Sequence, residues 1–306
     1  MTASGSVPGR QPIASPERPA VGAGSMPLRW LIAAATVGIY VALGLALHLD
    51  GNEYQVLGIP LLVGFQLLIH RQPIRTLWVR SGPPLRVDAR FISIWLVFSL
   101  VPAYDLVTAI QSRNVGFTAF AAAAIAGAFG LAYALRAMHR GNVRQLGLCI
   151  LTVGAVGILP QLAALVLPHL IHLHIAGQSS AARSVGALTL LKTGAATFFL
   201  GPVGFMVEEV FFRGGLDTYL HRGEKGTGWL SAVFVSALWG LWHLPGQSPV
   251  SLSGTHLVST ILALLVAQIV VGVPLSLWWR ASGNLVVTDT AHALLDSVRN
   301  SLALVA

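Results

Sequence analysis

The chain has 306 residues, of which 55% are hydrophobic and only 10% are charged. An average soluble domain carries roughly 25% charged residues, so this composition excludes a soluble globular protein and is typical of a protein that crosses a membrane several times. The formal net charge of +8 does not indicate a nucleic-acid partner, because the basic residues lie in short loops and form no stripe along one amphipathic helix.

The predicted elements begin after a tail. Residues 1–26 are rich in Pro, Gly, Ser and Ala and cannot bury apolar surface, which predicts a disordered cytoplasmic tail. The rest of the chain predicts an all-α polytopic membrane bundle of about eight or nine transmembrane helices, since one span needs about 20 apolar residues. The apolar runs are Leu28–Leu47, Tyr54–Ile69, Phe91–Ile110, Val115–Ala137, Leu146–Leu167, Gly186–Val207, Gly228–Leu244, Leu257–Trp279 and Asn284–Val305.

The charges in the loops predict the orientation of the first helix. Arg10, Arg18 and Arg29 precede it, whereas Asp50 and Glu53 follow it. Cytoplasmic loops carry an excess of Arg and Lys, so the N-terminus is expected in the cytoplasm. The arginine-rich loops around residues 71–90 and 136–144 are expected on the same, cytoplasmic side of the membrane.

The sixth run leads into an unusual pair of acids, Glu208 and Glu209, followed by Arg213. An ionisable side chain at the bilayer centre costs about 2.5–3.5 kcal/mol, which makes it a functional candidate. The apolar pattern after the acids predicts that the helix continues past them. Glu209 and Arg213 are spaced i and i+4 and are expected to pair, while Glu208 points about 100° away around the helix and has no such partner.

Two later histidines are placed to meet Glu208. Between Gly226 and Trp279 there is no Asp, Glu, Lys or Arg. His243, which lies in this stretch, follows the turn at residues 222–228 by nearly the same number of residues as Glu208 precedes it. At 1.5 Å per residue the two side chains are expected at matching depth on antiparallel helices. His292 and Asp296 share one face of the last helix, because they are spaced i and i+4.

A carboxylate with imidazoles suits hydrolysis of a peptide bond, which needs an activated water, a stabilised oxyanion and a proton for the leaving amine. Glu208 is the candidate base and His243 its partner on the water. His292 is then the candidate proton donor or oxyanion stabiliser. The same three residues could instead hold a zinc ion, since a Glu and two His with a water form a known zinc shell, and the sequence leaves both mechanisms open.

Three motifs stand in order on separate predicted helices: E-E-x-x-x-R at residues 208–213, W-G-L-W-H-L-P at 239–245 and H-x-x-x-D at 292–296. Together they resemble the CAAX protease and bacteriocin-processing (CPBP, Abi) family of intramembrane endopeptidases, over residues 186–302. The resemblance implies a helical membrane fold with a cavity open toward the membrane or the cytoplasm, in a bacterial cytoplasmic membrane.

The resemblance also implies roles for individual residues. Glu208 matches the family's catalytic base and His243 and His292 its active-site histidines, while Glu209 and Arg213 match a supporting pair. Two supporting positions depart from the usual pattern: Trp239 stands where Phe is usual and is expected to keep a packing role, and Asp296 stands where Asn is frequent. An ionised Asp cannot donate to an oxyanion as an Asn amide can, so Asp296 is expected to orient His292 or bind a metal.

The sequence therefore predicts a division into the tail 1–26, transmembrane helices of unknown role in 27–180, and a catalytic core in 181–306. The expected partners are the lipid bilayer and a membrane-associated peptide or protein substrate, with no nucleic acid. Two other functions stay open. One is a catalytically silent immunity or scaffold protein of the same fold, and the other is a proton-coupled transporter that uses the intramembrane acid and histidines as a relay.

Overall fold

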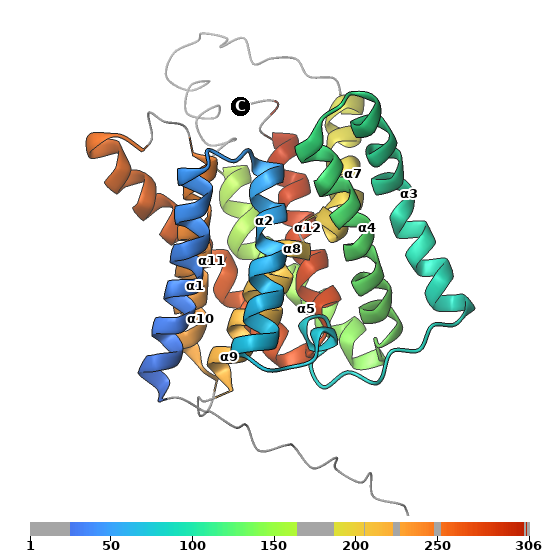
Figure 1. Cartoon of the computed structure of the whole chain (residues 1–306), viewed down its shortest axis with the longest axis horizontal. Coiled ribbons are helices and arrows are strands. Elements are labelled where there is room, and N and C mark those ends of the chain that lie inside the picture. The colour runs from blue at the N-terminus through green and yellow to red at the C-terminus, as the bar shows by residue number, and fades with distance from the viewer. Residues whose placement is uncertain are drawn as a thin grey trace, which may run out of the picture.

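The computed structural model describes residues 25–163, 187–204, 206–222, 227–247, 252–302 and 304. The predicted tail lies almost wholly outside these residues. Within them the chain is helical, and the only β-type contact is an isolated antiparallel bridge between Val79 and Asn284. The predicted all-α fold is confirmed (Figure 1).

The first half of the described chain forms long helices joined by short turns. The elements are α1 (Met26–Ala46), α2 (Gly51–Gly64) with its π-helical continuation η1 (Phe65–Ile69), the 3₁₀ turn η2 (Ile74–Leu77), α3 (Ala89–Gln111), α4 (Val115–Arg136), and α5 (Arg140–Val153) with the π-helical η3 (Gly154–Ile158). These elements follow the first five predicted runs. Capping explains several of the starts: the side chain of Asp50 accepts from the backbone N–H groups of Asn52 and Glu53, and Asn114 accepts from Phe117.

The second half holds the motifs on three helical runs. The first is α7 (Ala187–Gly204), α8 (Met206–Glu209), the π-helix η4 (Val210–Asp217) and α9 (Thr218–His221); the second is α10 (Trp229–Trp242) with the 3₁₀ turn η5 (Leu244–Gly246); the last helices are α11 (Gly254–Ser282) and α12 (Leu285–Leu302). The run after Gly228 gives a short helix of 14 residues.

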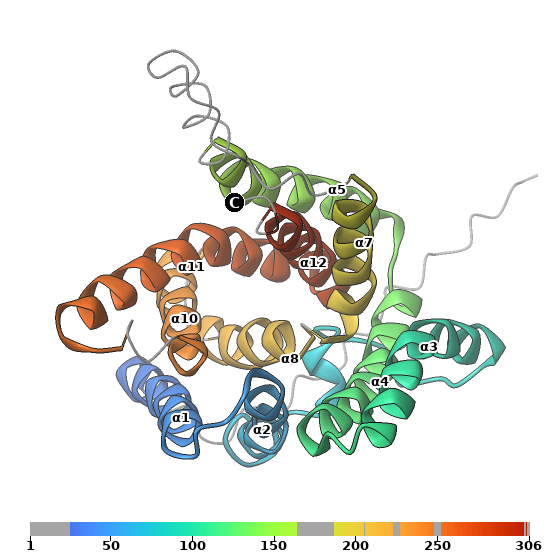
Figure 2. The ribbon, with the colours of Figure 1, turned by 90° about the horizontal axis from the view of Figure 1, so that it is seen from above.

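The protein is an integral membrane protein. Five helices of the described chain are long and apolar enough to cross a bilayer, namely Met26–Ala46, Ala89–Gln111, Val115–Arg136, Arg140–Ala163 and His256–Ser282. Many of their large apolar side chains are exposed, including Leu31, Leu96, Leu100 and Leu262, as expected of surfaces that face lipid. Figure 2 shows α8, α10, α11 and α12 around the middle of the bundle, with α1 and α2 along one side.

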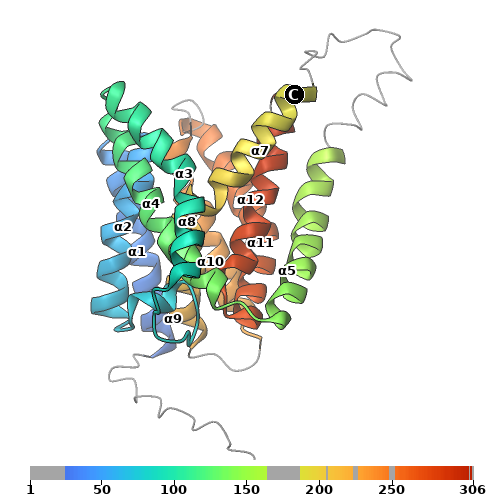
Figure 3. The same ribbon diagram turned by 90° about the vertical axis from the view of Figure 1, so that its right-hand side faces the viewer.

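The bundle has two distinct ends (Figure 3). The start of α1, the η2 loop and α9 lie at one end, which we call the basic end. The turn from α1 to α2 and the end of α12 lie at the other, which we call the opposite end.

The loop that contains η2 closes the basic end. Leu77 and Val79 are buried, the backbone N–H of Arg80 donates to the carbonyl of Gly283 at 2.8 Å, and the N–H of Leu285 donates to the carbonyl of Trp78 at 2.9 Å. A Cβ at Gly214 would overlap the carbonyl oxygen of Leu77. Glycine therefore lets this loop pack directly against the helix that carries the paired acids.

An ion pair anchors the same end. Both carboxylate oxygens of Asp217 accept from Arg280, at 2.9 Å from Nε and 2.6 Å from Nη2. The remaining donors of Arg280 reach the carbonyls of Thr227 and Gly228 and the hydroxyl of Ser231. This bidentate, fully bonded arrangement ties η4, α10 and α11 together.

Candidate active site

The two acids lie where one helix changes its geometry. α8 ends at Glu209, and the following residues, Val210–Asp217, form a π-helix. The helix thus continues past the acids as the sequence predicted, but in a form that the 3.6-residue pattern does not reveal. π-Helical turns are rare in proteins, and those that occur are often found at functional sites.

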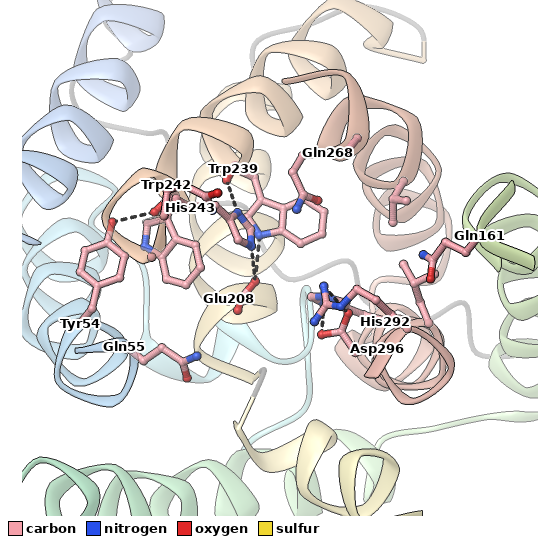
Figure 4. Close-up of a pocket in the computed structure, with 17 residues that line it drawn as sticks. Tyr54, Gln55, Gln161, Glu208, Trp239, Trp242, His243, Gln268, His292 and Asp296 are labelled. Atoms are coloured by element: carbon pink, nitrogen blue, oxygen red, sulfur yellow. Dashed lines mark hydrogen bonds and ion pairs between the residues drawn. The ribbon is translucent and has the colours of Figure 1, made fainter. Parts of the chain in front are cut away.

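Glu208 and His243 come together, as the hairpin arithmetic predicted. Oε2 of Glu208 lies 3.9 Å from Nε2 of His243 and accepts a hydrogen bond of 2.9 Å from the indole N–H of Trp239 (Figure 4). The separation of 3.9 Å exceeds a direct hydrogen bond, and a gap of this size between two polar atoms is suited to a bridging water.

The backbone fixes the orientation of the His243 ring. Its Nδ1 lies 2.8 Å from the carbonyl oxygen of Trp239, which can only accept, so Nδ1 carries the proton. In the neutral ring Nε2 then presents its lone pair toward Glu208. His243 follows the last residue of α10, and its side chain is 25% exposed, so the reactive edge of the ring is accessible.

His292 pairs with the other acid. Its Nδ1 lies 3.1 Å from Oε1 of Glu209, and Oε2 of Glu209 lies 3.6 Å from Nε of Arg213. The expected Glu209–Arg213 pair is therefore present, but Glu209 also contacts the histidine, which sequence spacing did not predict. Both Glu209 and Arg213 are buried, so the two cationic groups offset the cost of the buried carboxylate.

Asp296 lies on the other side of the same histidine. Its Oδ2 is 3.7 Å from Nε2 of His292, and its Oδ1 is 2.9 Å from Nη1 of Arg299. The imidazole of His292 thus has an acidic partner at each nitrogen. This arrangement stabilises the positively charged ring.

Trp239 does more than the packing role expected of it. Besides the hydrogen bond to Glu208, its ring lies 4.9 Å from the guanidinium carbon of Arg213, and it meets the ring of His292 edge to face at 5.1 Å. A phenylalanine would keep these ring contacts but has no N–H to donate. The expectation of packing alone is therefore incomplete, because sequence does not show where the indole nitrogen points.

A cavity of about 380 Å³ opens beside these residues. Glu208, His243 and His292 all line it, together with Trp239 and Asp296. Four neutral amides also line the cavity: Gln55, Gln161, Gln247 and Gln268. Since Gln55 belongs to α2 and Gln161 to the helix Arg140–Ala163, the first half of the chain, whose role was unknown, forms part of the wall.

Three other residues of the site were missed from the sequence. The hydroxyl of Tyr54 donates to the carbonyl of Trp242 at 3.0 Å, and Arg299 pairs with Asp296. Asp289 is fully buried in α12, and neither of its carboxyl oxygens has a hydrogen-bond partner among the described residues. Its spacing of three residues from His292 places it on the same helix face, which is the signal that could have revealed it.

The predicted zinc ligands do not form a metal-binding group in this arrangement. Among the described residues, no three His, Cys, Asp or Glu side chains are placed to hold a metal ion together. The nitrogens of His292 lie 3.1 Å from Glu209 and 3.7 Å from Asp296, so carboxylates occupy the positions beside both of them.

Comparison with known protein families bears on the resemblance seen in the sequence. Residues 188–298 match the family described as type II CAAX prenyl endopeptidase Rce1-like. This segment is similar to that family. The resemblance to the CAAX protease family seen in the three motifs is thereby confirmed, and the matched segment contains every motif residue from Glu208 to Asp296. No curated protein and no solved structure matches the chain.

Proposed function

We propose that the protein is an intramembrane endopeptidase that uses Glu208 as a general base, with substrates among membrane-associated peptides or proteins. The similarity to the Rce1-like family supports a CAAX-type intramembrane endopeptidase in general. The observation that supports the glutamate mechanism is the gap of 3.9 Å between Glu208 and His243 at the wall of a cavity.

In the proposed reaction a water binds between Glu208 and Nε2 of His243. Glu208 takes one proton from the water as the oxygen attacks the carbonyl carbon of the peptide bond. The C–N bond breaks when a proton passes to the leaving nitrogen, which yields a carboxylate and an amine. The hydrogen bond from Trp239 holds the accepting carboxylate in place, and the carbonyl of Trp239 holds the histidine.

The oxyanion that forms during attack needs a donor. Asp296 is paired with Arg299 and has no proton to give when it is ionised. The charged ring of His292 supplies positive charge beside the oxyanion in this mechanism, because it lines the cavity and two carboxylates keep it charged. Positioned charges of this kind stabilise developing negative charge strongly in a water-poor site.

The test compares the membrane and released peptides of cells that express the wild-type chain or Glu208→Gln. The glutamine keeps the hydrogen bond from Trp239 but cannot take a proton. Asp105→Asn is the matched control, because it makes the same chemical change in α3, outside the cavity lining. Peptides that are found with the wild-type chain and with Asp105→Asn, but not with Glu208→Gln, are products of the reaction and identify its substrates.

Other outcomes favour the alternatives. If wild-type and Glu208→Gln cells give the same peptides, the peptidase function fails and a silent scaffold or immunity protein is favoured. Proton flux in proteoliposomes that Glu208→Gln abolishes would instead indicate a transporter. Activity that survives exhaustive chelation of the purified protein, with no bound zinc, supports the glutamate mechanism, whereas activity lost with chelation and restored by zinc contradicts it.

A further inference from the structure

The two ends of the bundle differ strongly in charge. At the basic end, the loop between α2 and α3 carries Arg71, Arg75, Arg80 and Arg86, and the turn between α4 and α5 is flanked by Arg136 and Arg140. At the opposite end, the α1–α2 connection ends in Asp50 and the α3–α4 turn holds only Arg113. Because short cytoplasmic loops are the arginine-rich ones, the basic end faces the cytoplasm.

The path from the candidate site to the basic end is filled. Along the helix that carries the acids, the relative exposure falls from 6% at Glu208 to 1% at Glu209 and 0% at Arg213 and Asp217. Between Arg213 and the basic end lie the Asp217–Arg280 pair and the η2 loop, and this loop is hydrogen-bonded to the start of α12. His243 itself is 14 residues after the start of α10, or about 21 Å of helix from the basic end.

The cavity instead extends toward the opposite end. Its wall includes Gly51, the first residue of α2, and Gly246 and Gln247, which lie just beyond α10. Gly51 and Gly246 are exposed, and the side chain of Arg299, near the end of α12, is 50% exposed. The lining residues thus rise from the buried acids to an open rim at the opposite end.

From these observations, and resting on the proposed peptidase function, we infer that the site receives its substrate from the extracytoplasmic face of the membrane, and not from the cytoplasm as the family resemblance implied. The substrate class is a peptide segment of an exported or membrane-anchored protein that is exposed on that face. The four glutamine amides of the wall suit such a segment, because each amide both donates and accepts hydrogen bonds and so matches peptide groups without regard to charge.

Cysteine labelling tests the access route independently of catalysis. The probe is a charged, membrane-impermeant maleimide applied to intact cells. Gln247→Cys places a thiol at the rim of the cavity, and Arg86→Cys is the matched control at the basic end, where Arg86 is exposed. The parental chain provides the blank, because its single thiol, Cys149, is fully buried.

Gln247→Cys is expected to react in intact cells, and Arg86→Cys only after the membrane is permeabilised. The reverse pattern overturns the inference, as does labelling of Gln247→Cys that requires permeabilisation. A second measurement locates the peptides that are lost in Glu208→Gln cells, which are expected in the extracytoplasmic fraction. Products confined to the cytoplasm contradict the inference, whereas correct labelling without any changed peptide contradicts the peptidase function and leaves the access route standing.

Discussion

Two buried polar clusters lie on the same helical run and differ in how completely they are bonded. Asp217 and Arg280 meet at 2.6 and 2.9 Å, and each donor of the guanidinium has a partner. Around Glu208, Glu209 and His292 one ion-pair contact is short, at 3.1 Å between Glu209 and His292, whereas the others measure 3.6, 3.7 and 3.9 Å. Among the described residues, Oε2 of Glu209 and Nε of Arg213 have no hydrogen-bond partner. A fully satisfied network makes a structure rigid, whereas a loosely bonded one beside a cavity leaves capacity for water and substrate.

The largest effect is expected from a substitution in the loosely bonded cluster around Glu208 and Glu209. Glu208→Gln should lower kcat by about 10²- to 10⁴-fold, the usual contribution of a general base, because the amide cannot accept the proton of water. The midpoint of thermal unfolding in detergent should stay close to wild type, since the indole of Trp239 can still donate to the amide oxygen. A large fall in that midpoint would show that Glu208 is mainly structural.

The next prediction concerns the fully bonded pair of Asp217 and Arg280. Arg280→Ala leaves Asp217 buried without its partner, and breaking a buried pair in this way costs about 3–5 kcal/mol of stability. Equilibrium unfolding should show this loss, while kcat of the remaining folded protein should change far less than in Glu208→Gln.

A double variant is the control for that measurement. Replacing both partners, as in Asp217→Leu with Arg280→Met, should recover part of the stability, because no charge is left unpaired. A double variant less stable than Arg280→Ala would contradict the view that the pair acts as an anchor.

A smaller effect is expected from Trp239→Phe, which removes one hydrogen bond to Glu208 and keeps the aromatic ring. Hydrogen bonds to charged groups contribute about 1.5–3 kcal/mol, so kcat should fall roughly 10- to 100-fold. Trp242→Phe is the matched control, because its indole N–H lies in the same wall and does not bond to Glu208. Equal losses of kcat in both variants would mean that ring packing, and not the hydrogen bond, supports the carboxylate.

The smallest effect is expected at the rim. Arg299→Gln removes a half-exposed partner of Asp296, and such pairs contribute about 0–1 kcal/mol. kcat/KM should therefore change by less than about fivefold, the equivalent of 1 kcal/mol. A loss comparable to that of Glu208→Gln would place Arg299 in the catalytic machinery.

The meeting of Glu208 and His243 could be predicted from the sequence because it depends only on helix rise and on a turn marked by polar residues. The contact between Glu209 and His292 could not, because it joins helices 83 residues apart and spacing along one helix does not show which faces of α8 and α12 meet. The bond from Trp239 depends on a side-chain rotamer, and the closure of the basic end depends on a long-range fit between Gly214 and Leu77. Patterns along one helix carry neither kind of information.

The hydroxyl of Tyr54 holds the carbonyl of Trp242 at the end of α10, yet α2 lies outside the Rce1-like segment 188–298. The proposed hydrolytic residues and part of the wall that shapes the cavity therefore lie in different parts of the chain. Substitutions in α2 can redirect which peptides fit while the hydrolytic groups stay intact. Exchange of α2 between proteins of this fold is thus expected to change specificity without a change of chemistry.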